Sequence, residues 1–274
     1  MSASEHTPRP DSPTRDPEAI LPIRDIGDGP PVVFLHGYPL DHRMWGPDVG
    51  RFLPRHRIIL VDLPGYGDAQ TMASPDSLEA FSEAVDRTLQ ALSLGGATIV
   101  GHSMGGYIAL QLYRTHSERF GSLVLTNTRS KADSPEARDT RLAAAARLAR
   151  PGESLAVEDT VRSLLATRTI DTKPDVVDRV REIVRSVHSD RLVPTLRALA
   201  NRPDFTPVLP NIRVPTLVVW GDSDGLIPPA QTSEMVTRIP GAVGQEIPGA
   251  GHLPSLEAPK DFYGSLDRFL SRLH

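Results

Sequence analysis

Short apolar runs alternate along the chain with stretches whose apolar residues recur at helical spacing. Five such runs, rich in β-branched residues, cover positions 31–35, 57–61, 97–100, 122–125 and 215–220. Strands that are apolar at every position, rather than at every second position, are typical of parallel sheets buried on both faces. The runs therefore predict a buried, mostly parallel sheet.

Helical patterns lie between these strands. Residues 77–94 carry apolar side chains at helical spacing, with Asp76 as the expected N-cap and Gly95 as the expected C-cap, and residues 105–116 form a second such pattern. Strands that alternate with helices predict an α/β fold with a doubly wound sheet. Right-handed crossovers place the carboxyl end of every parallel strand at one edge, where ligands bind in such folds.

Residues 130–201 lack strand-like runs but contain helical patterns at 141–148, 157–166 and 176–187. We expect this stretch to be a helical cap, inserted before the penultimate strand and lying over the ligand-binding edge of the sheet. The polar, proline-rich N-terminus has no periodicity, so we expect it to be disordered. The predicted organisation is a disordered extension (1–17), an α/β core (18–129 and 202–274) and a helical cap (130–201).

Composition narrows the functional classes. The 274-residue chain has a net charge of −4 and no cluster of basic residues, which argues against a nucleic-acid partner or an anionic membrane surface. No apolar run approaches the roughly 20 residues of a membrane span, and the N-terminus lacks a signal-peptide core, so we expect a cytoplasmic protein. The absence of cysteine excludes disulfides and thiolate catalysis. Nothing in the sequence indicates an oligomeric state.

The strongest chemical signal is a G-x-S-x-G pattern at Gly101-His102-Ser103-Met104-Gly105. It follows a predicted strand and opens a predicted helix, the context of a serine nucleophile held on a sharp turn. Glycines at both ends let the turn form without side-chain collisions. A plain glycine-rich turn is the alternative, but the flanking strand and helix favour Ser103 as a nucleophile.

A serine hydroxyl needs a general base, and His252 is the best candidate. It lies in a glycine-rich loop, 248–252, after strand-like residues 245–247 and before a predicted terminal helix over 259–273. A late histidine fits the chain order nucleophile, acid, base of hydrolases with this turn. We expect the other histidines to brace the backbone (His36, His102), to face solvent (His42, His56, His116, His188) or to lie at the termini (His6, His274).

The acid that orients the base should follow the penultimate strand, where Asp222 and Asp224 both occur. We favour Asp224, which lies further into the loop, and assign Asp222 to the turn itself. Some relatives of this fold carry the acid after the preceding strand. Here that position, residues 126–129, has no carboxylate, which strengthens the choice of Asp224.

A tetrahedral intermediate needs fixed N–H donors for its oxyanion. We expect the backbone N–H of Met104, after the nucleophile, and that of Tyr38, after the first buried strand, because Pro39 has no N–H. Asp62 ends another strand, but we interpret residues 62–67 as a tight loop that shapes the site wall. Without an accompanying carboxylate or histidine cluster, the sequence predicts no metal site.

Together these motifs resemble the α/β-hydrolase superfamily over nearly the whole chain, from about Ile20 to Leu273. Residues 36–45 and the turn at Ser103 are similar to the branch of 3-oxoadipate enol-lactonases, small carboxylesterases and cofactor-free haloperoxidases. The resemblance implies a serine hydrolase that needs no cofactor and cleaves a small-molecule ester or lactone through an acyl-enzyme. Relatives with an aspartate nucleophile, such as haloalkane dehalogenases and epoxide hydrolases, are excluded by Ser103.

The resemblance leaves the substrate open. A C–C bond hydrolase or a perhydrolase would use the same Ser103, Asp224 and His252, and a non-catalytic ligand sensor is a third alternative. The predicted cap is poor in aromatic residues, so we expect a small or aliphatic acyl group. It is rich in arginine; most of these side chains should lie on solvated helix faces, but one of them could bind a substrate carboxylate with two hydrogen bonds.

Overall fold

The apolar runs form the centre of one sheet in the computed structural model, which describes residues 20–47 and 49–273. The predicted disorder of residues 1–17 lies outside the described residues. In the described part of the chain the strand order is β1-β3-β2-β4-β5-β6-β7, and all neighbours are parallel except β1 and β3. The strands are β1 (Ile23–Ile26), β2 (Pro31–Leu35), β3 (Arg57–Val61), β4 (Ala97–His102), β5 (Phe120–Thr126), β6 (Thr216–Gly221) and β7 (Val243–Ile247). The predicted α/β fold class is confirmed.

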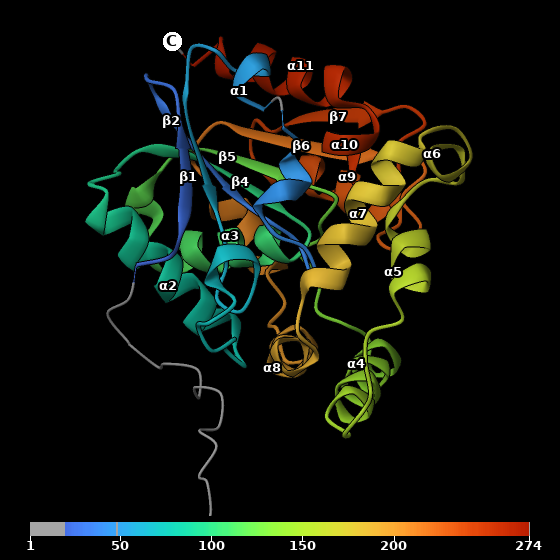
Figure 1. Cartoon of the computed structure of the whole chain (residues 1–274). Coiled ribbons are helices and arrows are strands. Elements are labelled where there is room, and N and C mark those ends of the chain that lie inside the picture. The colour runs from blue at the N-terminus through green and yellow to red at the C-terminus, as the bar shows by residue number, and fades with distance from the viewer. Residues whose placement is uncertain (1–19, 48, 274) are drawn as a thin grey trace, which may run out of the picture.

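Each face of the sheet has its own apolar core. Along β2, Val33 and Leu35 face one core with Phe81 of α2, whereas Val32 and Phe34 face the other with Phe262 of α11. Figure 1 shows α1 and α11 above the sheet and α2 and α3 below it. The core helices are α1 (Val49–Phe52), α2 (Leu78–Ala91), α3 (Met104–Thr115), α9 (Pro229–Arg238), α10 (Pro254–Glu257) and α11 (Pro259–Leu270), with short 3-10 turns η1 (His42–Trp45), η2 (Gly67–Ala69), η3 (Ser117–Arg119) and η4 (Thr206–Asn211).

The caps of α2 differ from the prediction. Ser77, not Asp76, is the N-cap, and its side chain accepts a hydrogen bond from the Ala80 N–H at 3.2 Å. The helix then ends with Leu92 as its C-cap, three residues before Gly95. Both serine and aspartate are good N-caps, so composition alone did not choose between the two neighbours.

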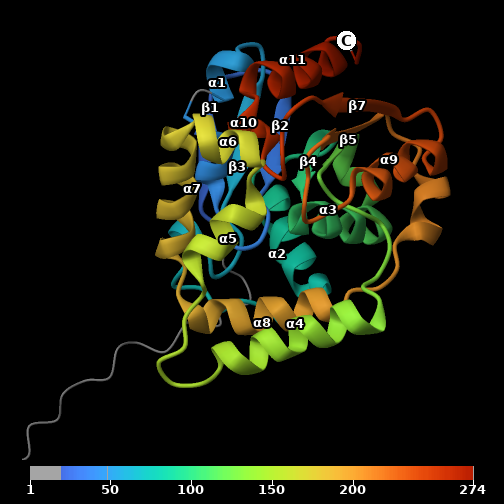
Figure 2. The ribbon, with the colours of Figure 1, turned by 90° about the vertical axis from the view of Figure 1, so that its right-hand side faces the viewer.

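Helices fill the chain between β5 and β6, where every residue is described. Three of them, α4 (Pro135–Leu148), α5 (Val157–Leu164) and α7 (Pro174–Ser186), match the predicted helical patterns; α6 (Thr167–Thr172) and α8 (Ser189–Ala200) were not predicted. The internal proline of α8, Pro194, weakens a helical pattern in the sequence. In Figure 2, α4 and α8 lie side by side below the sheet. No described helix has the length and apolar character needed to cross a membrane.

Candidate active site

Ser103 occupies a strained turn between β4 and α3. Its backbone has φ 50° and ψ −112°, which a residue with a side chain rarely adopts, and such strain costs about 1–3 kcal/mol. The surroundings hold it in place: the Ser103 N–H donates to the Thr126 carbonyl at 3.0 Å, and the Thr128 hydroxyl donates to the Ser103 carbonyl at 2.8 Å.

The glycines beside Ser103 are required by close backbone contacts. A Cβ on Gly101 would lie 2.5 Å from the Gly105 carbonyl oxygen, and a Cβ on Gly105 would lie 2.1 Å from the Leu35 carbonyl oxygen. A larger residue at Gly101 would collide with the first turn of α3, and a larger residue at Gly105 would collide with the end of β2. The sequence argument for small residues on both sides of Ser103 is therefore supported by these distances.

A cavity of about 220 Å³ brings together residues from distant parts of the chain. Tyr38, Ser103, Met104 and His252 all line it, so four of the five predicted site residues share one space. Met104 is the first residue of α3, so its N–H has no acceptor within the helix and the positive end of the helix dipole faces the cavity.

The fifth predicted residue, Asp224, lies directly behind His252. The His252 Nδ1 and Asp224 Oδ2 are 2.8 Å apart, and both side chains are buried. Asp224 Oδ1 also accepts the N–H groups of Leu226 and Ile227 at 2.9 and 3.0 Å. With Nδ1 directed at Asp224, the imidazole keeps Nε2 for another partner.

The charge of Asp224 follows from two opposing effects. Burial raises its pKa. The charge of His252 and hydrogen bonds from His252, Asn127 and the Ile227 N–H lower the pKa by more than burial raises it, so the result is about 2. Asp224 is therefore a carboxylate at neutral pH, able to hold one imidazole orientation and to stabilise a positive imidazolium.

Asn127 is part of this arrangement, and the sequence analysis missed it. It directly follows β5 with φ 46°, and its side-chain amide donates to Asp224 Oδ2 at 2.8 Å and to the Gly251 carbonyl at 3.1 Å. The same position was considered only as an alternative site for the acid. An asparagine at the end of a central strand, where polar residues collect at the ligand-binding edge, was the available signal.

Glu257 is a second residue that the sequence did not identify. Its buried carboxylate accepts the N–H groups of Gly251 and Leu253 at 2.9 and 3.0 Å on one oxygen. The other oxygen accepts from the Ala166 N–H at 2.8 Å and the Thr169 hydroxyl at 2.7 Å. Glu257 thus ties the loop that carries His252 to the helices inserted between β5 and β6.

Asp222 has the turn role that the sequence predicted. Its Oδ1 accepts the Gly249 N–H and the Ser223 hydroxyl, each at 2.8 Å. The contact with Gly249 connects the loop after β6 to the loop after β7. Asp222 is exposed and does not line the cavity in the described part of the chain.

The other histidines partly contradict the sequence analysis. His36 braces the backbone as predicted, because its Nε2 accepts the Leu63 N–H at 3.0 Å. Within the described chain the buried Nε2 of His102 has no hydrogen-bond partner, so that bracing contact is not observed. His42 and His56 were expected to face solvent, and this is wrong: His56 is buried, and the side chain of His42 is only 16% exposed.

His42 is shielded because it joins two loops. Its Nδ1 lies 2.7 Å from Asp62 Oδ2, and its N–H donates to Asp62 Oδ1 at 2.8 Å. Asp62 also accepts the Asp68 N–H at 2.8 Å. No residue of the loop 62–67 lines the cavity beside Ser103 in the described chain, so the expectation that this loop forms a wall of the site is not supported.

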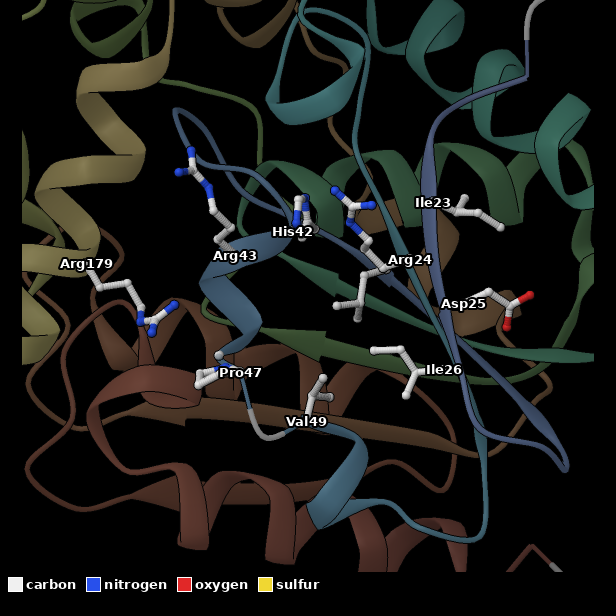
Figure 3. Close-up of a pocket in the computed structure, with 11 residues that line it drawn as sticks. Ile23, Arg24, Asp25, Ile26, His42, Arg43, Pro47, Val49 and Arg179 are labelled. Carbon is white, nitrogen blue, oxygen red and sulfur yellow. The ribbon is translucent and has the colours of Figure 1, made fainter.

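A larger cavity, of about 470 Å³, lies beside His42 rather than beside Ser103. Figure 3 shows its lining, with Arg24, Arg43 and Arg179 and the apolar Ile26 and Val49 around it. Arg24 pairs with Asp68, and Arg43 pairs with Asp41 at 2.7 Å and with Glu182 at 3.1 Å. Arg24 and Arg43 are therefore largely neutralised by neighbouring carboxylates.

Among the described residues, one group has ligand atoms close enough for a metal ion: Asp41, His42 and Asp62, all within 4.8 Å of one another. Their ligand atoms already have protein partners. Both oxygens of Asp41 accept from the Arg43 guanidinium, and His42 Nδ1 is hydrogen-bonded to Asp62. These bonds account for the cluster without an ion, and the absence of a metal site stays a prediction.

The sequence model described as "Alpha/beta hydrolase family" matches residues 32–264. The chain belongs to the alpha/beta hydrolase family. The predicted resemblance to the α/β-hydrolase superfamily is therefore confirmed. Membership of this family, and the similarity to esterases, support hydrolase activity.

Individual relatives cover most of the chain. It is 29% identical over 260 residues to a pimeloyl-[acyl-carrier protein] methyl ester esterase of Aeromonas hydrophila, covering 90% of this chain and 98% of that protein. The structure of a malate-bound thermophilic esterase from Thermogutta terrifontis is similar with a TM-score of 0.87, 33% identity and coverage of 93% and 94%. The structure of an enol-lactonase from Burkholderia xenovorans LB400 is similar with a TM-score of 0.83 and 25% identity. The match covers 92% of this chain and 96% of that chain.

Proposed function

We propose that the protein is a serine hydrolase that cleaves a carboxylic ester or lactone through an acyl-enzyme. The observation that carries the proposal is the buried His252–Asp224 pair, 2.8 Å long, whose histidine lines the same cavity as the strained Ser103. A nucleophile, a base and an orienting acid on three separate strand ends are what acyl transfer requires. The esterase and enol-lactonase relatives support the same class of substrate.

The proposed reaction has two half-reactions. Ser103 Oγ attacks the ester carbonyl while His252 Nε2 takes its proton, and Asp224 stabilises the resulting imidazolium. The N–H groups of Tyr38 and Met104 hydrogen-bond the negative oxygen of the tetrahedral intermediate. Its collapse expels the alkoxide, which takes the proton from His252. Water then attacks the acyl carbon with His252 as base, and the acid leaves as Ser103 regains its proton.

The helices between β5 and β6 act, in this proposal, as a cap (residues 130–201) on a core of residues 18–129 and 202–274. Support comes from the cavity, which is walled by Arg141 of α4, by Thr160 and Ser163 of α5, and by Leu199 of α8. A volume of about 220 Å³ favours a small acyl group. No cofactor is needed for these steps, and a small-molecule ester is the only partner they require.

The test is hydrolysis of 4-nitrophenyl acetate by wild type and Ser103→Ala. We expect the substitution to lower kcat/KM by about 10³-fold or more, because the nucleophile is lost. Ser233→Ala, at a half-buried position of α9 that does not line the cavity, is the matched control and should retain wild-type activity. Wild-type turnover by a folded Ser103→Ala variant would overturn the proposal. A panel of lactones, peracids and C–C cleavage substrates then separates ester hydrolysis from the alternative reactions.

A further inference from the structure

Two arginines line the same cavity as Ser103 and His252. Arg129 follows β5, and Arg141 projects from α4. Both reach the same buried carboxylate: Arg129 lies 2.6 Å from Asp133 Oδ1, and Arg141 lies 2.7 Å from Asp133 Oδ2. A third arginine, Arg202, is fully buried, lies 2.9 Å from Asp133 and stacks over the Tyr107 ring at 4.4 Å.

This cluster carries excess positive charge. Burial raises the pKa of Asp133, but the charges and hydrogen bonds of Arg141 and Arg202 outweigh burial and lower the pKa overall. Asp133 is therefore ionised at neutral pH. Among the described residues it is the only carboxylate paired with these three arginines, because the other side-chain partner of Arg129 is the neutral Gln231. Three positive charges against one negative charge leave a formal excess of two beside the cavity.

The arginines that face the cavity also keep unused donors. Within the described chain, the hydrogen bonds of Arg141 involve only its Nε, so its two terminal amino groups remain available. Each terminal amino group of Arg129 makes one hydrogen bond in the described chain, to Gln231 and to Asp133, so each keeps a second N–H. A guanidinium with two free donors in one plane matches the two oxygens of a carboxylate.

Other arginines of the inserted helices differ from this cluster. Arg147 pairs with Glu153 at 2.7 Å, with 43% and 38% of the two side chains exposed. Arg185 pairs with Glu158 at 3.2 Å and is 61% exposed. These pairs lie in solvent and need no further partner. The excess positive charge of the cluster lies on the half-buried side chains of Arg129 and Arg141, where water screens charge poorly.

We propose that the physiological substrate carries a second, ionised carboxylate, which Arg141 and Arg129 bind while Ser103 attacks the ester. The substrate class is a monoester of a dicarboxylic acid, or a lactone that carries a free carboxylate. This inference rests on the proposed function, because it places the substrate's ester group at Ser103. It replaces the expectation of a simple aliphatic acyl group with that of an acidic one.

The test compares two esters of the same shape, monoethyl glutarate and ethyl 5-methylhexanoate, in which a carboxylate replaces an isopropyl group. Ethanol release gives kcat/KM for each ester, and the ratio of the two values measures the preference for the acid. We expect wild type to prefer monoethyl glutarate by about tenfold or more. Arg141→Met should lower that ratio by about 10- to 100-fold, mainly through KM, as expected for a lost hydrogen-bonded charge.

Two further variants separate recognition from folding. Arg138→Met lies on the same helix, α4, where its side chain is exposed and bonds Asn201, so both kcat/KM values should stay at the wild-type level. Arg141→Lys keeps the charge but loses the planar fork, so it should restore only part of the ratio. A ratio that is equal in wild type and folded Arg141→Met would overturn the inference.

The outcomes for the two proposals are distinct. If wild type cleaves 4-nitrophenyl acetate through Ser103 but does not prefer monoethyl glutarate, the carboxylate site is overturned and the proposed function stands. If no ester is cleaved in a Ser103-dependent way, the proposed function itself is overturned. A wild-type preference that Arg141→Met removes and Arg138→Met retains supports both.

Discussion

Two of the histidine–aspartate pairs in the described chain have nearly the same hydrogen-bond length but differ in their surroundings. His252 Nδ1 lies 2.8 Å from Asp224, and His42 Nδ1 lies 2.7 Å from Asp62. Each aspartate follows a parallel strand, accepts backbone N–H groups as well and has a lowered pKa. Neither the pair distance nor the charge on the carboxylate distinguishes them.

The difference is what the imidazole faces. His252 shares a cavity of about 220 Å³ with Ser103 and with Tyr38 and Met104, whose backbone N–H groups we assign to the oxyanion. His42 lines the larger cavity of about 470 Å³, where no lining residue in the described chain is Ser, Thr or Cys. A base without a nucleophile has only a structural role. The smaller cavity is therefore the better candidate, because it has the required groups.

The largest expected contrast comes from removing each carboxylate. Asp224→Asn should lower kcat/KM for 4-nitrophenyl acetate by about 10⁴-fold, as the equivalent change does in serine proteases, because an amide selects the wrong imidazole tautomer. Asp62→Asn should leave kcat/KM of the folded enzyme within about threefold of wild type. Equal losses in the two folded variants would place the His42 pair in catalysis and contradict the comparison.

A second contrast concerns what fixes each histidine. Glu257→Gln should lower the free energy of unfolding by about 3 kcal/mol, because the amide NH2 that replaces one oxygen would direct its own hydrogens at two of the four donors that the buried carboxylate now accepts. The control is Glu246→Gln on β7, whose exposed side chain accepts only the Trp220 Nε1–H at 3.0 Å. Urea unfolding measures both variants. Wild-type stability of Glu257→Gln would show that the loop carrying His252 is held by other contacts.

The smallest effect is a pH dependence of the second pair. The hydrogen bond to Asp62 raises the pKa of His42 above its ordinary value, although burial opposes it. A raised folded-state pKa means that the pair stabilises the fold fully below about pH 6.5 and loses this contribution as pH rises through the folded value. The stability advantage of wild type over His42→Gln, from urea unfolding, should shrink between pH 5 and pH 9. An advantage that grows with pH would refute the assignment.

The fold was largely predictable because its signals are local. The apolar runs of β2 to β6 and the glycines around Ser103 are contiguous in the sequence, so their patterns predict strands and a turn. The antiparallel β1 was missed because its residues, Ile23–Ile26, are mostly exposed and lack an apolar run. Helix α8 was missed because Pro194 interrupts its pattern.

The rest of the candidate site depends on contacts that no local pattern carries. The bond from Asn127 to Asp224 joins residues 97 positions apart, and Glu257 binds Ala166 across 91 positions. His42 was assigned to solvent because its sequence neighbours are polar, yet it is shielded by a loop 20 residues later. Side-chain partners at such separations are set by the tertiary fold.

The most direct test of the central claim is covalent labelling with a fluorophosphonate, which reacts with activated serines. We expect one phosphonyl group per chain, on the peptide that contains Ser103. His252→Ala should slow labelling by about 10³-fold or more, whereas His42→Ala should label at the wild-type rate. Labelling at another serine, or at the wild-type rate in folded His252→Ala, would contradict the assignment of Ser103 and His252 as nucleophile and base.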